Sequence, residues 1–404
     1  MIFLEPYRVL EKIYFEGARL KLALSSTPLG EKRGRTVLLV YSVLEHDKYL
    51  ELCIDTFSER PPKKSVRLVL KIALAAVLYA SVPRAVAGSE AVALTRKLGK
   101  GGAAGFVNAF LRRFSENEVP MPEGEAGISI RSNFPLFAVR RALEEYGERA
   151  ERILTAKSHG VSVRFVRGLE RYQELPREDT PFPGVKIFKT FTRDENFFAG
   201  DYTFQSVGSV AICEMVSPCD KLLDACAAPG GKSVLLAGKC GEVTACELHG
   251  HRTALIREYC ARMGVNNVTA VQGDSSSFNP AFEGAFNGVL CDVPCSGFGT
   301  VSENPDLPLN KREEDFVSLG GVQRAILENC SRYVKRGGKL YYSTCSIFRA
   351  ENDSVVGEFL AAHPEFELER ADSPLAHDKT NYGVQFLPDT AFGAGFYMAV
   401  MKRK

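Results

Sequence analysis

At 404 residues the chain is longer than one hydrophobic core usually supports, and its 45% apolar residues suffice to fill ordinary cores, so we expect two or three domains. Its 51 basic and 49 acidic residues leave a net charge of only +2, so the overall composition does not mark a nucleic-acid binder. Eleven cysteines without a C-x-x-C pair, in a chain that begins without a secretory signal, argue against a disulfide framework and a metal site. We therefore expect free thiols and a cytoplasmic location.

Residues 1–120 predict an all-α domain, because apolar residues recur at helical spacing in about five segments. The most apolar run, residues 66–82, includes Arg67 and Lys71 and is too short for a membrane span, so we expect a buried helix and no membrane partner. With 19 basic and 12 acidic residues, this part of the chain carries either an uneven solvated surface or a phosphate-binding face.

Residues 115–127, SENEVPMPEGEAG, predict a linker because they are rich in Glu, Pro and Gly and lack an apolar period. Residues 128–200 then predict a small α/β module of helices followed by short strands. From residue 201 to 404, strand-like runs alternate with helical segments, which indicates a parallel sheet covered by helices on both faces. Ligands of such sheets bind outside the carboxyl ends of the strands.

The segment LLDACAAPGGKS, residues 222–233, predicts a tight turn between a strand and a helix. It is not a phosphate loop, because Cys226 stands where that motif requires glycine, and Ala and Pro also exclude the dinucleotide fingerprint. Asp224 ends the strand, and the glycines at 230 and 231 allow a ligand to approach the backbone.

Two more carboxylates follow the next predicted strands. Glu247 stands where a carboxylate accepts hydrogen bonds from a ribose diol, and Asp274 is placed to accept from an adenine amino group. Each alone is equally well explained as a solvated strand end or an ordinary turn residue. Together with a glycine turn that lacks phosphate-binding features, they favour a nucleoside ligand without a pyrophosphate, and S-adenosylmethionine is the obvious candidate.

Two cysteines, in DVPCSG (292–297) and STCS (343–346), directly follow predicted strands among polar, turn-forming residues. Free cysteine is usually a buried, space-filling residue, and we expect that of most of the other nine. Cys295 and Cys345 instead have the setting of reactive thiols.

The motifs DACAAPGGK, DVPCSG and STCS have the order and spacing of the RNA cytosine-C5 methyltransferases, and GFVNAFLRR resembles the end of the NusB-type helical fold. The chain as a whole resembles the bacterial 16S ribosomal RNA cytosine-C5 methyltransferase B family. The resemblance implies three parts: an all-α NusB-like RNA-binding domain over 1–120, the small α/β module over 128–200, and a Rossmann-like S-adenosylmethionine-dependent methyltransferase domain over 201–404.

The resemblance also implies the site. It makes Cys345 the nucleophile and Cys295 the residue that promotes product release. The cofactor and the base are then lined by residues of the glycine turn and by three carboxylates: Cys226, Ala227, Ala228, Pro229, Gly230, Gly231, Lys232, Glu247, Asp274 and Asp292.

The expected reaction is methylation of C5 of a cytidine in 16S ribosomal RNA. C5 is too electron-poor to attack a methyl group directly, so a thiolate, here Cys345, first adds to C6. We assign Asp292, protonated or sharing a proton, to the N3 edge of the base, and Cys295 to removal of the C5 proton. The target cytidine must be unpaired or flipped out of a helix.

One alternative is a non-catalytic NusB-like ribosome assembly factor that binds RNA and keeps a degenerate cofactor fold. A small-molecule methyltransferase would leave the first 120 residues without a role. Ser302 and Glu303 stand where the family usually carries basic residues, and a carboxylate is unfavourable near RNA phosphates. We expect a monomer whose partner is the small-subunit ribosomal RNA.

Overall fold

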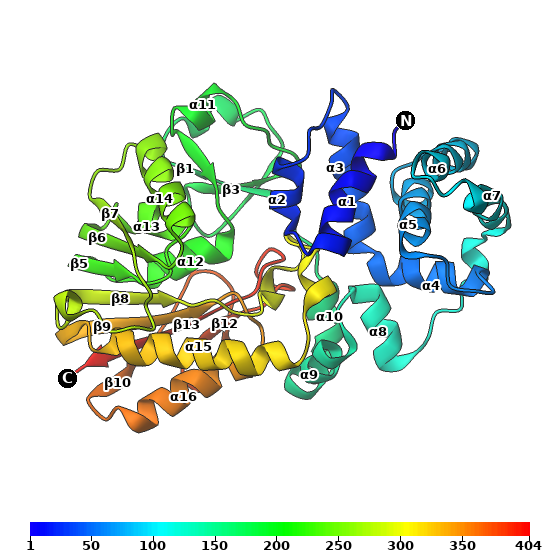
Figure 1. Ribbon diagram of the computed structural model, residues 1–404. Helices are drawn as coiled ribbons and strands as arrows, with labels where there is room; N and C mark the ends of the chain where they lie inside the picture. The colour runs from blue at the N-terminus through cyan, green and yellow to red at the C-terminus, as the bar shows by residue number, and fades with distance from the viewer. The chain divides into compact units, whose positions relative to one another are not determined.

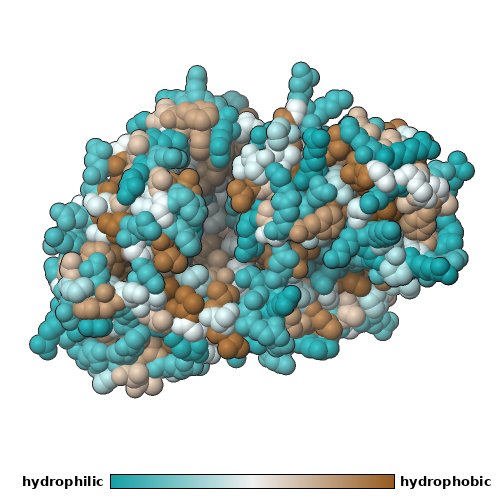
Figure 2. Space-filling view, viewed as in Figure 1, coloured by the Kyte–Doolittle hydropathy of each residue, from teal (hydrophilic) through white to brown (hydrophobic).

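The computed structural model describes residues 1–404, which form two compact units (Figure 1). One unit contains Met1–Thr155 together with the returning segment Asn304–Lys311, and the other contains Ala156–Glu303 and Arg312–Lys404. No helix combines the length and the hydropathy that crossing a lipid bilayer requires. On the face that Figure 2 shows, hydrophobic residues reach the surface of each unit mostly in small groups among hydrophilic ones.

The first unit is all-α, as the helical spacing predicts. Its ten helices are α1 (Leu4–Glu16), α2 (Leu20–Ser25), α3 (Arg33–Glu45), α4 (Asp47–Phe57), α5 (Lys64–Tyr79), α6 (Arg84–Lys97), α7 (Ala104–Arg113), α8 (Gly124–Ser132), α9 (Leu136–Tyr146) and α10 (Ala150–Thr155). The apolar run at 66–82 forms most of α5, which is buried over nearly every turn, so its prediction as a core helix is confirmed.

Two features of this unit differ from the expected segmentation. The long apolar run after residue 33 is split into α3 and α4 at His46, whose ring stacks on that of Tyr79 with 3.8 Å between centroids. The segment Asn304–Lys311 returns to this unit, where the Asp306 carboxylate accepts a hydrogen bond of 3.2 Å from the backbone N–H of Leu20. Contacts this distant in sequence leave no local signal.

Residues 128–200 do not form a module of their own. Helices α8–α10 belong to the first unit, because the Asn133 side chain ties them to α3 and α4: it donates to the Leu44 carbonyl (2.7 Å) and accepts from the Lys48 N–H (3.0 Å). The expected strands do form, but in the second unit, as an antiparallel sheet of order β2-β3-β1-β4. Its strands are β1 (Val161–Phe165), β2 (Arg177–Asp179), β3 (Val185–Phe188) and β4 (Tyr202–Phe204).

Arg262, in helix α14 (Gly250–Met263), connects this small sheet to the rest of the second unit. The Arg262 guanidinium donates to the carbonyls of Phe197 (2.8 Å) and Tyr202 (3.2 Å) and lies 4.0 Å from the centre of the Phe197 ring. The boundary between compact units therefore falls at residue 155.

The rest of the second unit is a nine-stranded sheet with β5 (Cys219–Asp224), β6 (Cys240–Glu247), β7 (Val268–Gln272), β8 (Phe286–Asp292), β9 (Val334–Thr344), β10 (Phe366–Glu369), β11 (Asp378–Lys379), β12 (Val384–Phe386) and β13 (Phe396–Arg403). The strand order is β11-β12-β13-β9-β8-β5-β6-β7, and β10 pairs with β13. Strands β5 to β9 are parallel to their neighbours, whereas β13 runs antiparallel to β9.

Helices cover both faces of this sheet, as the alternation of strands and helices predicts (Figure 1). Successive residues of a strand point to opposite faces: Leu222 packs in the cluster that includes α12, whereas Leu223 packs in the cluster that includes α15 and α16. The covering helices are α12 (Val207–Met215), α13 (Gly231–Leu236) and α14 (Gly250–Met263) on one face, and α15 (Glu314–Ser331) and α16 (Asp353–Ala362) on the other.

Candidate active site

The carboxyl ends of the central strands gather the polar residues that the motifs single out. The chain runs outward from β5 through β6 to β7 and then returns to β8 and β9 on the other side of β5, so the strand order reverses between β5 and β8. A crevice at this switch point is the usual ligand site of such a sheet. Asp224, Glu247 and Asp292 are the last residues of β5, β6 and β8, and Cys345 directly follows β9.

The turn between β5 and α13 needs glycine. Gly230 has φ +105°, in the left-handed region that other residues rarely adopt. A Cβ on Gly231 would meet nothing closer than 3.6 Å, so this glycine is not required by packing within the protein. Arg252 braces the turn by donating to the Ala228 carbonyl at 3.0 Å.

Asp224 is almost completely buried at the base of this turn. Its Oδ2 accepts a hydrogen bond from the Ser233 hydroxyl at 2.6 Å, whereas its buried Oδ1 has no hydrogen-bond partner. Burial raises the pKa of Asp224 to about 6. An unpaired buried acceptor of this kind is suited to a donor on a bound ligand.

The two downstream carboxylates differ in setting. Glu247 is buried and accepts hydrogen bonds from the His249 N–H (3.1 Å) and from Arg252 (3.2 Å). Asp274 is exposed after β7, where it accepts from the backbone N–H (2.9 Å) and hydroxyl (2.6 Å) of Ser276, and these bonds lower its pKa. Asp274 thus closes a local turn in this structure, and a contact with an adenine amino group stays a prediction.

Lys232 and Asp292 form an ion pair across the switch point. Lys232 Nζ donates to Asp292 Oδ2 at 2.7 Å, and the Ser343 hydroxyl donates to Oδ1 at 2.7 Å. Burial disfavours the charged ammonium, but the negative charge of Asp292 outweighs it and raises the pKa of Lys232 above its usual range. A positive charge is therefore held beside the strand end that carries Cys345.

The sulfur atoms of Cys295 and Cys345 lie 3.2 Å apart. Both thiols are free and half-buried, and the Cys345 N–H donates to the Cys295 sulfur at 3.3 Å. The pairing of Asp292 with Ser343 in the β8–β9 ladder sets this proximity, because each cysteine follows within three residues.

The surroundings of the two thiols shift their pKa values in opposite directions. The hydrogen bond from Cys295 lowers the pKa of Cys345 against the effects of burial and of the negative charge of Asp292, and the positive charge of Lys232 acts in the same direction as the hydrogen bond. The same hydrogen bond, together with burial, raises the pKa of Cys295 well above its usual range. Cys345 is thus the thiol that ionises more readily, and Cys295 holds its proton.

A buried glutamate, absent from the sequence-based site, holds both cysteine loops. Glu351 is fully buried and accepts hydrogen bonds from the Ser296 N–H (2.7 Å), from Gln323 (3.1 Å) and from the hydroxyls of Ser296 and Ser346 (2.5 Å each). Because Ser296 and Ser346 directly follow the two cysteines, one carboxylate positions both thiols. The shared Cys-Ser dipeptide was the only signal in the sequence that could have pointed to it.

The loop after Cys295 uses Ser302 internally. The Ser302 hydroxyl donates to the Gly393 carbonyl, so this side chain ties two loops of the second unit together. At a position where the resemblance led us to expect a basic residue, Ser302 thus makes a structural hydrogen bond. Among the predicted site residues, Cys226 packs against the core that includes α15, and burial raises its pKa well above its usual range.

These features define the class of protein: a Rossmann-like group-transfer domain with a glycine turn and paired thiols at its switch point, in a chain that begins with an all-α unit. Models of two known families match its two parts. Residues 214–402 match "16S rRNA methyltransferase RsmB/F", and residues 8–116 match "NusB family".

Similarity to relatives extends over nearly the whole chain. The "Probable ribosomal RNA small subunit methyltransferase B" of Bacillus subtilis is 30% identical, with 95% of this chain and 94% of that protein covered. The "Ribosomal RNA small subunit methyltransferase B" of Xylella fastidiosa is 29% identical, with 97% of this chain and 98% of that protein covered. The chain therefore belongs to the 16S rRNA methyltransferase RsmB/F family and is an RNA methyltransferase, which confirms the resemblance found in its motifs.

Solved structures share the fold. The protein PH0851 superposes with a TM-score of 0.84 at 22% identity, covering 99% of this chain and 97% of that one. NSun6 from Pyrococcus horikoshii superposes with a TM-score of 0.61 at 18% identity, covering 67% of this chain and 99% of that one. The predicted fold class, an all-α NusB-like region followed by a Rossmann-like methyltransferase domain, is confirmed.

Proposed function

We propose that the protein methylates C5 of a cytidine in small-subunit ribosomal RNA, with S-adenosylmethionine as the methyl donor and Cys345 as the nucleophile. The observation that carries this proposal is the pair of sulfur atoms 3.2 Å apart beside the Lys232–Asp292 ion pair. Membership of the RsmB/F family supports the RNA substrate, and the two thiols support a pyrimidine as the base that is modified.

The residues at the switch point suit the cofactor. Asp224 Oδ1 offers a buried acceptor without a partner, and the open side of Gly231 allows a ligand to lie close to the backbone. The turn at residues 226–232 would hold the amino-acid part, with Glu247 at the ribose and Asp274 at the adenine. When bound, S-adenosylmethionine supplies a methyl group on a positively charged sulfur.

Cys345 opens the reaction by adding to C6 of the cytosine. Its thiolate forms the S–C6 bond, the C5–C6 π electrons move toward C5, and N3 takes up a proton so that the ring stays neutral. We assign that proton to the Lys232–Asp292 pair, because Lys232 carries an N–H that Asp292 already orients at 2.7 Å. This refines the sequence-based assignment of N3 to Asp292 alone.

Cys295 closes the reaction. After methylation a base removes the C5 proton, the electrons of that bond restore the C5–C6 double bond, and Cys345 leaves as a thiolate. N3 returns its proton to the Lys232–Asp292 pair, which restores the neutral base. In the free protein, the hydrogen bond and charge of Cys345 raise the pKa of Cys295. Once Cys345 is bonded to C6 its hydrogen bond and charge no longer raise the pKa of Cys295, whereas burial and the charge of Glu351 still do. Cys295 then acts as the base, directly or through a water molecule.

The target cytidine must leave any helix to reach both thiols. Unstacking a paired base costs a few kcal/mol, so an unpaired loop nucleotide is the more favourable substrate. The NusB-like unit would supply further RNA contacts, since residues 1–120 carry 19 basic and 12 acidic side chains and residues 8–116 match the NusB family.

The test compares Cys345→Ala with Cys295→Ala, using small-subunit ribosomal RNA and radiolabelled S-adenosylmethionine. Cys345→Ala should transfer no methyl group. Cys295→Ala should accumulate a covalent RNA–protein complex that survives a denaturing gel, because elimination fails after addition. Cys219→Ala, which removes a half-buried thiol at the start of β5, the end of that strand away from the site, is the control and should behave as the wild-type protein.

Mapping of 5-methylcytosine by bisulfite sequencing identifies the modified base. Equal, adduct-free turnover by both active-site variants contradicts the assignment of the thiols. RNA binding without calorimetrically detectable binding of S-adenosylmethionine would instead favour a non-catalytic assembly factor.

A further inference from the structure

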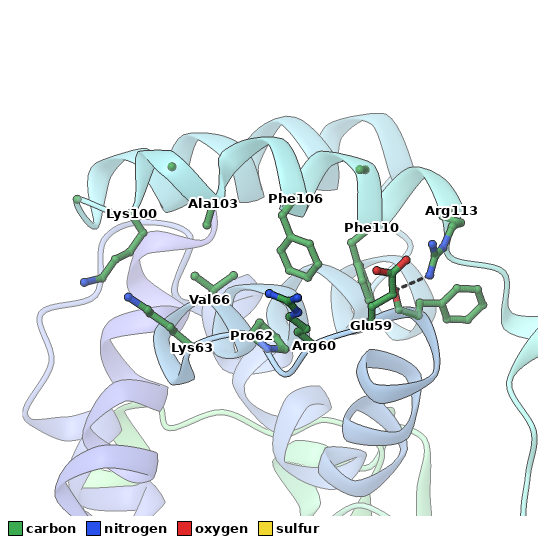
Figure 3. Close-up of a pocket in the computed structure, with 14 residues that line it drawn as sticks. Glu59, Arg60, Pro62, Lys63, Val66, Lys100, Ala103, Phe106, Phe110 and Arg113 are labelled. Carbon is green, nitrogen blue, oxygen red and sulfur yellow. Dashed lines mark hydrogen bonds between the residues drawn. The ribbon is translucent and has the colours of Figure 1, made fainter.

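A groove beside helix α7 in the first unit combines an apolar floor with a basic rim (Figure 3). Its volume is about 810 Å³. Val66, Phe106 and Phe110 line its floor, and the ring of Phe106 points from α7 toward the loop that carries Arg60 and Pro62. We call this feature the α7 groove.

Cations stand at both ends of the α7 groove. Lys63 and Lys100 lie at one end, and Arg113 lies at the other end beside Glu59, the single acidic residue that lines the groove (Figure 3). Arg113 donates a hydrogen bond of 2.9 Å to the Phe57 carbonyl, which fixes this cation at the rim. Arg60, Lys63 and Lys100 are exposed and have no carboxylate partner.

The charge extends beyond the groove. Between residues 60 and 113 the chain has eleven basic residues and one acidic residue, Glu90. Only Arg67 and Lys71 among the eleven form ion pairs, with carboxylates of α4. On the other side of α7 a second groove of about 620 Å³ is lined by Arg84, Arg96 and Arg112 and by no acidic residue. Unpaired positive charge on both sides of one helix attracts a polyanion.

Phe106 offers a stacking surface within this charge. The side chain is 37% exposed, and its ring lies 6.2 Å from that of Phe110, which packs in turn on Phe57 and Phe114. The ring thus lies next to the aromatic cluster of the core while part of it stays accessible. A supported aromatic ring between cations is the arrangement that binds an unpaired nucleotide: the base stacks and the phosphates pair with the cations.

The glycines around Lys100 leave room for a phosphate. A Cβ placed on Gly99, Gly101 or Gly102 would meet no atom within 4 Å, so the loop backbone is open on that side. Small residues in this position allow a phosphate to come close to the main chain. An acidic peptide helix would instead need a longer apolar stripe than this short floor provides, and would not account for the second basic groove.

We propose that the α7 groove binds an unpaired segment of the RNA substrate, with one base stacked on Phe106 and its phosphates on Lys63 and Lys100. The proposal rests on the proposed function for the identity of the RNA. This groove would be a second RNA-contacting surface. Its residues are distant in sequence from the candidate active site at the carboxyl ends of the strands.

The test uses the full-length protein and an unmodified small-subunit ribosomal RNA fragment. Phe106→Ala should weaken binding about tenfold, because the base loses its stacking partner. Lys63→Glu combined with Lys100→Glu should weaken it by at least tenfold and make the dependence of log K on log salt shallower by about 1.4. In turnover, KM for RNA should rise while kcat at saturating RNA is unchanged.

Matched controls lie elsewhere in the same unit. Leu136→Ala removes an apolar side chain of the same exposure (37%) on α9, and Lys21→Glu with Lys32→Glu makes the same change of charge at exposed positions outside the groove. Both should bind RNA as the wild-type protein does. Crosslinking with 4-thiouridine-containing RNA should label the tryptic peptide of residues 101–112, which contains Phe106, and the label should be lost in Phe106→Ala.

The outcomes separate this proposal from the proposed function. If the wild-type protein methylates RNA but the groove variants match their controls in affinity, KM and crosslinking, the groove proposal is overturned and the proposed function stands. If the wild-type protein binds RNA without methylating it, the proposed function fails and the affinities still decide the groove. Absence of RNA binding by the wild-type protein overturns the groove proposal.

Discussion

The sulfur atoms of Cys295 and Cys345 are 3.2 Å apart although fifty residues separate them in the chain. They lie close together because β8 and β9 are parallel neighbours. The residues that follow the two strands are therefore at the same side of the sheet, outside the carboxyl ends of the strands. At this distance the two thiols titrate as a pair, and the neighbouring charges decide which of them ionises. The predictions below follow from that asymmetry and from the residues that maintain it.

Lys232 should contribute to the pH dependence of Cys345, whose thiol pKa is lowered first by the hydrogen bond of Cys295 and then by this ammonium. Its positive charge lowers the pKa of the Cys345 thiol, so Lys232→Met should raise that pKa and move the rise of thiol reactivity to higher pH. Lys232→Arg keeps the charge and should leave the profile close to that of the wild type. The measurement is the rate of iodoacetamide alkylation at Cys345, followed by peptide mass spectrometry from pH 6 to 10. Identical profiles for the two variants would show that Lys232 does not tune the thiol.

Glu351 should act as a positioning residue. Glu351→Ala leaves the Ser296 N–H and the other donors without their acceptor in a buried site, which should lower the free energy of unfolding by about 2–4 kcal/mol. Glu351→Gln keeps the volume and one acceptor, and should lose less stability. In this milder variant kcat should fall at least tenfold with KM for RNA unchanged, because the thiols are misplaced while the RNA contacts remain.

Glu358→Ala is the matched control for Glu351. Glu358 is exposed on α16 and pairs with Arg324, so its loss should change stability by less than about 1 kcal/mol and leave kcat unaltered. Urea unfolding and steady-state kinetics measure both effects. A Glu351→Gln protein that is destabilised but keeps wild-type kcat would assign Glu351 a structural role only.

The two glycines of the turn should respond differently to alanine. Gly230→Ala forces a side chain into a φ of +105° and against Ile256 at 3.3 Å, so it should destabilise the protein by about 1–2 kcal/mol. Gly231→Ala meets no protein atom closer than 3.6 Å and should fold as the wild type. If the cofactor lies over this turn, Gly231→Ala should still weaken its binding, which calorimetry with S-adenosylmethionine measures. Unchanged affinity in Gly231→Ala would place the ligand elsewhere.

Asp224 should make stability depend on pH. Burial raises its pKa in the folded protein to about 6, above the value of an unfolded aspartate, so the folded state binds the proton more tightly. Stability should therefore fall as pH rises from about 4 to 6, by about 2–3 kcal/mol, when the buried carboxyl ionises. Asp224→Asn should lack this component. The difference in urea midpoint between variant and wild type, measured at pH 4.5 and 7.5, checks it, and a pH-independent difference would contradict it.

Local patterns in the sequence determined much of this protein. The alternation of apolar segments predicts the parallel sheet with helices on both faces, and polar motifs directly after strands predict where Asp224, Glu247, Asp292 and the two thiols gather. These inferences succeed because the periodicity of a strand or helix, and the direction in which it ends, are properties of consecutive residues. The three motifs also identified the family.

Only the tertiary structure decided the rest. The grouping of α8–α10 with the helical unit depends on Asn133 meeting Leu44, and the return of residues 304–311 depends on Asp306 meeting Leu20. Three other features likewise join residues from separate elements: the hydrogen bonds of Glu351 to both cysteine loops, the ion pair of Lys232 with Asp292, and the basic groove around Phe106. Such contacts arise when packing brings distant segments together, and packing depends on the shapes and charges of many residues at once, so no local pattern encodes them.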